Sequence, residues 1–263
     1  ATTLFVALSL VACDQGSGSS FARKSTTTSS QQSPVDDGTS SNGEENELTD
    51  DADTGDAGDA TGQPAPALSA VDINAARTAL GSLPTRGFSP NVPKYDRNEF
   101  GKPWSDDVTV DGGHNGCDTR NDILARDLTD VEFKPAKRNC IVTKGKLNDP
   151  YTNTTIEFKR GRKSSDLIPI DHVVALGDAW YSGAYQWDAD RRRNFANDPI
   201  NLQATNRESN TQKSAKNAAE WLPPNTAYQC EYVGRQITIK STYGLSVTPA
   251  EKNAMEKVLA TCS

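Results

Sequence analysis

The chain has 263 residues, a formal net charge of −7 at pH 7 and 35% hydrophobic residues. Residues 14–70 carry eleven Asp/Glu and two Arg/Lys, a net of −9, which leaves residues 71–263 with a net of about +2. No apolar run is long enough for a membrane-spanning helix, so a transmembrane protein is not expected.

Residues 3–12 form a short apolar run, which predicts the hydrophobic part of a signal peptide. The run ends in Leu10-Val11-Ala12-Cys13, which resembles the lipobox of bacterial lipoproteins. The resemblance implies that residues 1–13 are part of a lipoprotein signal peptide and that Cys13 is lipidated. Ordinary secretion with an incidental Cys13 is the alternative. Both interpretations place the protein outside the cytoplasm, either anchored by lipid to the outer face of the cell membrane or secreted.

Residues 14–70 are rich in Ser, Thr, Gly, Asp and Glu and contain almost no aliphatic residues. Such a segment cannot bury enough apolar surface to fold. Because its like charges repel one another, we expect an extended, disordered tether. Residues 71–263 are long enough for one hydrophobic core, and we expect them to form a single domain.

Hydrophobic spacing and turn residues predict both helices and strands in this domain. In chain order, helices are expected at residues 72–80, 121–128, 175–185, 189–195, 207–220 and 249–259, and strands at 131–133, 141–147, 154–158 and 167–174. Residues 87–104 predict a loop, and residues 229–239 a closing hairpin. Thr248 and Glu251 predict a capping box at the start of the last helix. The fold class is therefore α+β.

Four cysteines remain if Cys13 carries lipid: Cys117, Cys140, Cys230 and Cys262. Four cysteines in an exported domain predict two disulfides, with three possible connectivities. We favour Cys117–Cys140 and Cys230–Cys262, because each pair closes a loop within one half of the domain. A zinc site is the rival interpretation, although the sequence has no CxxC pair and only two histidines.

The most informative polar residues follow one predicted strand. Asp171 and His172 lie near its end, and Asn201, Asn210 and Lys213 follow downstream. Asp171 offers a hard oxygen ligand for a divalent cation, and His172 offers a base that titrates near neutrality. Asn210 adds a neutral oxygen ligand from a segment that is predicted to be helical.

Together these residues resemble the HNH nucleases, whose site is a ββα-metal finger. The strings DHVVALGDAW and FANDPINLQA and, upstream, GCDTRN and Asp149-Pro150-Tyr151 resemble in particular a group of exported, mostly actinobacterial HNH-family proteins, over about residues 94–262. Their shared domain was first catalogued as having unknown function. His172 and Asn201 lie 29 positions apart, a longer gap than in compact fingers, which predicts an inserted helix pair. The resemblance implies a ββα-metal finger embedded in a single disulfide-stabilised domain.

The resemblance also implies roles for individual residues. His172 is expected to be the general base, and Asn201 to fix the loop and orient the His172 ring. Asp171 and Asn210 are expected to hold Mg²⁺ or Mn²⁺, and Arg120 and Lys213 to contact substrate phosphates. The implied activity is metal-dependent hydrolysis of DNA, or of RNA, with little sequence specificity, by a monomer that meets a membrane only through Cys13.

Each of these residues has an ordinary alternative. Asp171 and His172 can form a hydrogen-bonded pair without catalysis, Asn201 can be a turn or cap residue, and Arg120 can pair with Asp118 or Asp122. A catalytically silent nucleic-acid-binding or cell-envelope interaction module is therefore the competing function. A secreted protease or esterase is disfavoured, because no GxSxG-like elbow is present.

Overall fold

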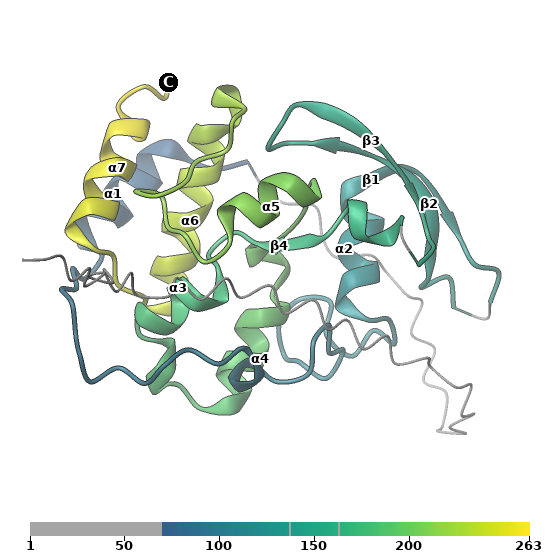
Figure 1. The fold of residues 1–263 in the computed structure, drawn as a ribbon, viewed down its shortest axis with the longest axis horizontal. Coiled ribbons are helices and arrows are strands. Elements are labelled where there is room, and N and C mark those ends of the chain that lie inside the picture. The colour runs from purple at the N-terminus through teal and green to yellow at the C-terminus, as the bar shows by residue number, and fades with distance from the viewer. Residues whose placement is uncertain (1–69, 137, 163) are drawn as a thin grey trace, which may run out of the picture. The chain divides into compact units, whose positions relative to one another are not determined.

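The computed structural model describes residues 70–136, 138–162 and 164–263, all within one compact unit (Figure 1). The prediction for Cys13 and nearly all of the predicted tether lie outside the described residues. The helices are α1 (Ile73–Ser82), α2 (Thr119–Asp127), α3 (Leu176–Tyr181), α4 (Ala189–Asn197), α5 (Arg207–Lys213), α6 (Gln229–Tyr243) and α7 (Pro249–Leu259), and the strands are β1 (Leu128–Phe133), β2 (Val142–Asp149), β3 (Thr154–Lys159), β4 (Ile170–His172) and β5 (Leu202–Ala204).

The strands form two small antiparallel sheets. One has the order β1-β2-β3, and the other pairs β4 with β5. Leu128 lies opposite Leu147, and Leu147 lies opposite Ile156, so apolar side chains from all three strands share one face. This face packs against α2. The predicted α+β class is confirmed.

Two apolar cores meet at β4. Ile170 belongs to the core that α2 shares with the three-stranded sheet. Val173, directly after β4, belongs to the larger core built mainly by α1, α3, α4, α6 and α7. Asp171 and His172 lie between these two residues, so the polar pair is held at the seam between the cores.

The larger core is mostly helical. α1, α6 and α7 pack on one another (Figure 1). The predicted capping box of α7 is confirmed, since Thr248 Oγ1 accepts from the Glu251 backbone while the Glu251 side chain accepts from the Thr248 backbone. No helix within the described ranges combines the length and the hydropathy that crossing a bilayer requires.

The predicted hairpin over residues 229–239 is wrong, because this stretch lies within α6. Val233 and Ile237 are both fully buried and lie one turn apart. The β-branched residues that favoured strands therefore form one face of a helix. Gly234 allows the chain before α1 to approach α6, because a Cβ at this position would lie only 2.3 Å from Cγ1 of Val71.

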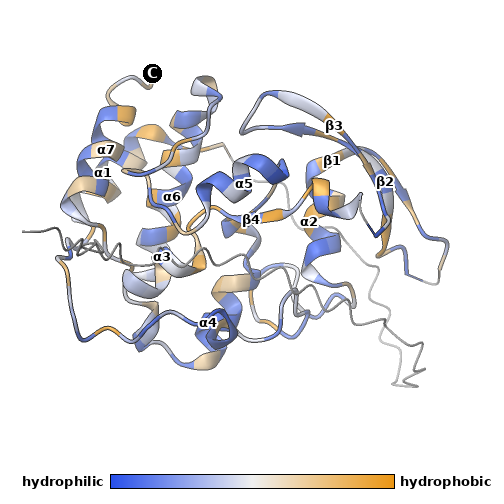
Figure 2. Ribbon diagram, viewed as in Figure 1, coloured by the Kyte–Doolittle hydropathy of each residue, from blue (hydrophilic) through white to orange (hydrophobic). Residues whose placement is uncertain are grey.

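Two helices are shorter than the sequence predicts. α3 ends at Tyr181, and the chain turns at Gly183, whose φ of 133° favours glycine. α5 ends at Lys213, because Ser214 adopts a positive φ of 49°. α5 is hydrophilic along its length (Figure 2), so polar contacts and not an apolar stripe attach it to the protein.

Both predicted disulfides, Cys117–Cys140 and Cys230–Cys262, are confirmed. With their thiols in disulfides, these four residues offer no zinc ligands, and the rival zinc interpretation is wrong. Cys230 lies in the first turn of α6 and Cys262 follows α7, so this bridge joins two helices that already pack together.

Removal of the Cys230–Cys262 bridge is expected to lower the free energy of unfolding by about 3–4 kcal/mol. The bridge closes a loop with a sequence separation of 32, and loops of this size restrict the unfolded chain by about that amount. Urea unfolding of the Cys230→Ser/Cys262→Ser variant measures the loss. An unfolding midpoint equal to that of the wild type would contradict the prediction.

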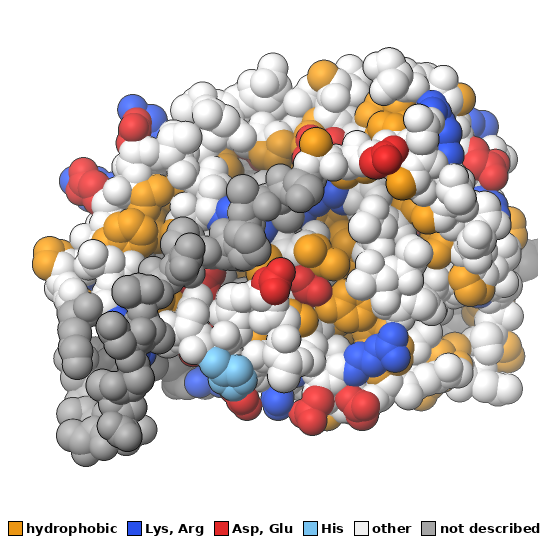
Figure 3. Space-filling view, turned by 180° about the vertical axis from the view of Figure 1, so that it is seen from behind, with side chains coloured by type: hydrophobic (Ala, Val, Ile, Leu, Met, Phe, Trp, Pro, Cys, Tyr) orange, Lys and Arg blue, Asp and Glu red, His pale blue; other side chains and the backbone are white. Residues whose placement is uncertain are grey.

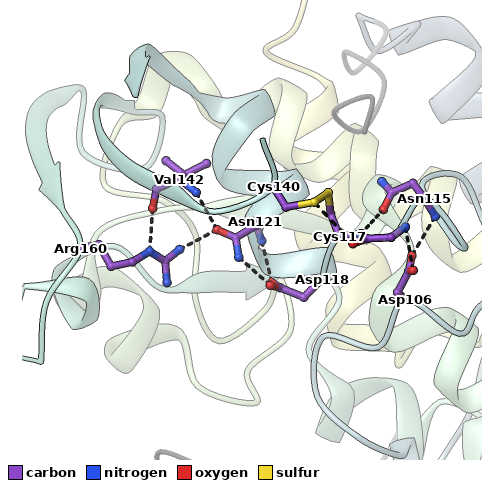
Figure 4. The surroundings of a disulfide bond; sticks show 9 residues. Asp106, Asn115, Cys117, Asp118, Asn121, Cys140, Val142 and Arg160 are labelled. Carbon is purple, nitrogen blue, oxygen red and sulfur yellow. Dashed lines mark hydrogen bonds between the residues drawn. A yellow bond between two sulfur atoms is a disulfide. The ribbon is translucent and has the colours of Figure 1, made fainter. Parts of the chain in front are cut away.

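The other disulfide anchors the loop before α2 (Figure 4). Asp118 accepts from the Asn121 backbone at 2.9 Å and so caps α2 directly after Cys117. Asn121 Oδ1 in turn accepts from the Val142 backbone at 3.0 Å, close to Cys140. The covalent bridge and these hydrogen bonds hold the start of α2 against the start of β2.

Asp122, within α2, gives the fold a pH dependence. Burial raises its pKa to about 7, a hydrogen bond from Asn115 opposes the shift, and the carboxylates of Asp118 and Asp106 add to it. Since the unfolded carboxyl titrates near 3.8, the folded state binds more protons between these values, and stability falls as pH rises from about 4 to 7.

Asp122→Asn is therefore expected to stabilise the protein at pH 8, on the order of 1–2 kcal/mol after allowance for solvent screening, and to have little effect at pH 4. Thermal unfolding at the two pH values measures the change in stability. Asp111→Asn, a substitution of an exposed aspartate, is the control. The same shift at both pH values would show that the charge of Asp122 is not the cause.

Candidate functional site

Five of the sequence-predicted site residues lie where β4 pairs with β5 and where α5 follows β5 (Figure 1): Asp171, His172, Asn201, Asn210 and Lys213. Arg120 lies in α2. In the register of this pair, Asp171 lies opposite Gln203 and His172 opposite Leu202. Two arginines hold β5 in place. Arg126 and Arg235 both donate to the main-chain oxygen of Leu202, at 2.7 Å and 3.2 Å. The strand that faces the Asp171-His172 pair is therefore fixed from two directions.

Both carboxylate oxygens of the buried Asp171 are hydrogen-bonded. The Tyr151 hydroxyl donates to Oδ2 at 2.7 Å, and Lys213 Nζ donates to Oδ1 at 3.0 Å. Lys213 is fully buried and also donates to the main-chain oxygen of His172 at 2.8 Å. Burial, followed by the charge of Asp171, raises the pKa of Tyr151 well above its usual value, so its hydroxyl keeps its proton. Asp171 is thus held in one orientation.

The ring of His172 is fixed by a main-chain carbonyl. His172 Nε2 lies 2.8 Å from the oxygen of Ala196, at the end of α4. A carbonyl can only accept, so Nε2 carries the proton and Nδ1 holds the lone pair. Burial, followed by the charge of Arg97, lowers the pKa of His172 to about 3. The lowered pKa favours the neutral ring at pH 7, and the role of His172 as a general base stays a prediction.

Trp104 covers the His172 ring. The two rings are nearly parallel, with 14° between their planes and 6.1 Å between their centroids. Trp104 lies in the loop after Phe100, in the region where the sequence predicted only a Pro/Gly-punctuated loop. This loop therefore forms one wall of the site.

Asn201 fixes the chain directly after β4. Its Oδ1 accepts from the Val174 backbone at 2.8 Å, its Nδ2 donates to the Val174 oxygen at 3.3 Å, and its own main-chain oxygen accepts from Val173. Asn201 is fully buried. It thus holds backbone next to His172, whereas the imidazole itself is bonded to Ala196.

Asn210 lies one turn before Lys213 on α5, so the two side chains share a helix face. It is half-buried, and among the described residues its side chain has no hydrogen-bond partner. Its free amide oxygen and the carboxylate of Asp171, whose oxygens retain further lone pairs, are hard ligands of the kind that Mg²⁺ and Mn²⁺ prefer.

The described residues contain no cluster of three or more His, Cys, Asp or Glu that could hold a metal ion. An ion at this place would therefore take Asp171 and Asn210 as its protein ligands and complete its shell with water and substrate. Mg²⁺ is commonly bound in this way, through one or two carboxylates and several waters. Each oxygen of Asp171 already accepts one hydrogen bond, from Tyr151 or from the Lys213 ammonium, and metal binding by Asp171 and Asn210 stays a prediction.

Arg120 and Lys213 both donate hydrogen bonds to other groups of the protein. Arg120 Nη2 donates to the main-chain oxygens of Ser165 and Ile168, at 3.0 Å each. Lys213 is bound to Asp171, as described above. The predicted contact of these two residues with substrate phosphates stays a prediction, and the geometry assigns both of them a structural task as well.

The basic stretches at residues 159–163 and 191–193 are used in part within the fold, while Lys159 and Arg162 are exposed. Arg160 donates to the Val142 backbone at 2.7 Å, Arg192 pairs with Glu99 at 2.9 Å, and Arg193 pairs with acidic neighbours. On the face seen in Figure 3, acidic and basic side chains are interspersed. These runs are therefore not, by themselves, a basic surface.

Sequence reasoning missed four groups at the site: Tyr151, Ala196, Trp104 and Arg97. Tyr151 lies in the Asp149-Pro150-Tyr151 string that carries part of the family resemblance, and this was a usable signal. Ala196 acts through its main-chain oxygen, which no side-chain pattern reveals. Trp104 and Arg97 reach the site from a loop far upstream, so their proximity depends on the tertiary fold.

Comparison with known proteins gives the family of this chain. Residues 118–258, slightly more than half of the chain, match GmrSD restriction endonucleases, C-terminal domain. An uncharacterized secreted protein of Arthroderma benhamiae is 37% identical over 203 residues, which cover 76% of this chain and 92% of that protein. No solved structure matches the chain. The matched region includes every residue from Asp171 to Lys213 discussed above, and the chain belongs to the family of the GmrSD restriction endonuclease C-terminal domain.

Proposed function

We propose that this protein is an extracytoplasmic, metal-dependent endonuclease that hydrolyses phosphodiester bonds of DNA, or of RNA, with little sequence specificity. The observation that carries the proposal is the neutral His172, whose ring is fixed by the Ala196 carbonyl beside the oriented carboxylate of Asp171. Membership in a family named for restriction endonucleases supports it.

We further infer that β4, β5 and α5 form the ββα-metal finger, with α3 and α4 inserted between its strands. Three features support this inference: the antiparallel pairing of β4 with β5, the helix that follows β5, and the placement of Asp171 and Asn210 on the strand and the helix. The insertion also supplies the carbonyl of Ala196 that holds the imidazole.

In the proposed reaction, His172 Nδ1 accepts a proton from the water that attacks phosphorus. The Nε2–H bond to Ala196 keeps the lone pair on Nδ1 and remains in place when the ring becomes positively charged. Asn201 prevents the backbone after His172 from shifting. Tyr151 and Lys213 keep the Asp171 carboxylate in one orientation. A Mg²⁺ or Mn²⁺ ion held by Asp171 and Asn210 would stabilise the charge on the phosphate and on the leaving oxygen.

The compartment is proposed on two grounds. The two disulfides are typical of oxidising compartments outside the cytoplasm, and the Arthroderma benhamiae relative is described as secreted. Attachment through a lipidated Cys13 remains part of the proposal. Two lipid chains on Cys13 would be enough for stable anchoring. A Cys13→Ser variant is therefore expected to leave the membrane fraction, and fractionation of the cells measures this.

Removal of metal is expected to abolish cleavage. The full chain would be incubated with supercoiled plasmid, linear DNA, single-stranded DNA and RNA in Mg²⁺, in Mn²⁺ or in EDTA. Added Mg²⁺ or Mn²⁺ should restore the EDTA-treated protein, and Asp171→Ala and Asn210→Ala should need a higher Mn²⁺ concentration than the wild type. Binding of these nucleic acids without cleavage in any metal would instead favour a catalytically silent binding module.

A further inference from the structure

A cavity of about 60 Å³ lies directly beside His172. One side of it comes from the loop that contains Arg97, Lys102 and Trp104, and the other from His172 and the end of α4, including Asn197. The cavity is large enough for several water-sized groups and small enough to admit only part of a ligand. It therefore suits the edge of a larger molecule that extends into solvent.

Asn197 supplies a buried acceptor without a donor. Only 1% of Asn197 is exposed, and its Nδ2 donates to the main-chain oxygen of Arg193 at 2.9 Å. Its Oδ1 is buried, and in the described part of the chain nothing donates to it. An amide oxygen can only accept, so a ligand that satisfies it must present an N–H or O–H group.

Two cations line the same cavity. Arg97 and Lys102 are both exposed, and both line the cavity together with His172. No partner for the Lys102 ammonium is found among the described residues. An anion is therefore favoured at the rim, whereas a hydrogen-bond donor is required at Asn197.

We propose that this cavity receives the edge of one nucleotide of the substrate, adjacent to the bond that is cut. In this arrangement Asn197 Oδ1 accepts from an O–H or N–H group of the sugar or base, while Arg97 and Lys102 bind the flanking phosphates. Phosphodiester oxygens carry no proton at neutral pH, so Asn197 recognises the nucleoside part and not the backbone. The proposal rests on the proposed nuclease function and makes Asn197 a specificity residue for it.

Binding in EDTA tests the pocket separately from cleavage. Fluorescent single-stranded homopolymers of deoxyribonucleotides and ribonucleotides would be titrated with the full chain, and their anisotropy measured. Asn197→Leu is expected to raise the Kd about 5- to 30-fold, the value of one hydrogen bond to a buried acceptor. Lys102→Ala should raise the Kd and lower the salt slope by about one. Lys257→Ala, an exposed lysine on α7, is the matched control and should bind as the wild type does.

The two possible donors give different patterns. If the donor is the ribose 2′-hydroxyl, the wild type prefers RNA and Asn197→Leu removes that preference. If the donor belongs to a base, the wild type binds homopolymers of the same sugar with different Kd values, and Asn197→Leu binds them with equal Kd values. Asn197→Leu also removes a hydrogen bond to Arg193, so its urea unfolding midpoint must be measured to detect a loss of stability. Lys102 is exposed, and Lys102→Ala therefore provides an independent test of the pocket.

Two results separate failure of the pocket from failure of the proposed function. The first result is that the wild type cleaves and that Asn197→Leu and Lys102→Ala both cleave with the KM of the wild type. This result would overturn the proposed pocket but not the proposed nuclease function. A wild type that cleaves no nucleic acid in any metal would overturn the proposed nuclease function. Unchanged Kd values for both variants in EDTA would overturn the pocket whatever the cleavage result.

Discussion

His172→Ala is expected to lower the rate of DNA cleavage at least about 100-fold, with little change in KM. A positioned general base typically contributes 10²–10⁴-fold, and the substitution removes the Nδ1 acceptor. The Asp171–Lys213 pair remains, so the loss should lie in kcat. Single-turnover cleavage of plasmid DNA under matched metal and pH measures it.

The other histidine provides the control. His114 is exposed, with 64% of its side chain accessible, and lies between Phe100 and α2. His114→Ala should cleave as the wild type does. Excess Mn²⁺ should partly restore Asp171→Ala but not His172→Ala, because only the former loses a metal ligand. Cleavage by His172→Ala at the wild-type rate would show that the HNH assignment of this site is wrong.

Lys213→Met is expected to lower the free energy of unfolding by about 3–5 kcal/mol. The substitution leaves the buried Asp171 carboxylate with Tyr151 as its side-chain donor, and an uncompensated buried charge is costly. Urea unfolding in EDTA measures the loss without interference from bound metal. Lys216→Met, an exposed neighbour on the segment after α5, should change stability by less than about 0.5 kcal/mol.

A double-mutant cycle separates the ion pair from simple loss of packing. Asp171→Asn removes the charge that Lys213 compensates, so the double variant should be more stable than the two single losses predict. The expected coupling energy exceeds about 1 kcal/mol, as for residues in direct contact. Additive losses would mean that Lys213 stabilises the protein through contacts other than its pair with Asp171, such as its bond to the main-chain oxygen of His172.

The parts of the fold that depend on local spacing could be predicted from the sequence. Thr248 and Glu251 form their capping box within one turn of α7, and the disulfide pairing follows from which cysteines lie near one another in the chain. α6 could not be predicted in the same way. Its β-branched residues favour strands, and only packing against α1 and α7 selects the helix.

The candidate site shows the same division. The set of Asp171, His172, Asn201 and Asn210 could be recognised from its order along the chain, although the gap of 29 positions between His172 and Asn201 is longer than in compact fingers. The environment of these residues could not be predicted from the sequence. The low pKa of His172 depends on burial and on Arg97, which is brought close only by the tertiary fold. The burial of Lys213 depends on where α5 stops, and a hydrophilic helix gives no sign of it.

The two walls of the cavity beside His172 differ in their relation to the family match. The wall with Asn197 lies within the region that the family shares, whereas Arg97, Lys102 and Trp104 precede residue 118, where the family match begins. A protein that carries only the shared region would keep the imidazole and the acceptor but lack the opposite wall. Exchange of the upstream segment would then alter substrate preference while the catalytic strand pair is inherited unchanged. Under the proposed function, the segment before residue 118 is therefore where substrate preference can change with the least disturbance of His172 and Asp171.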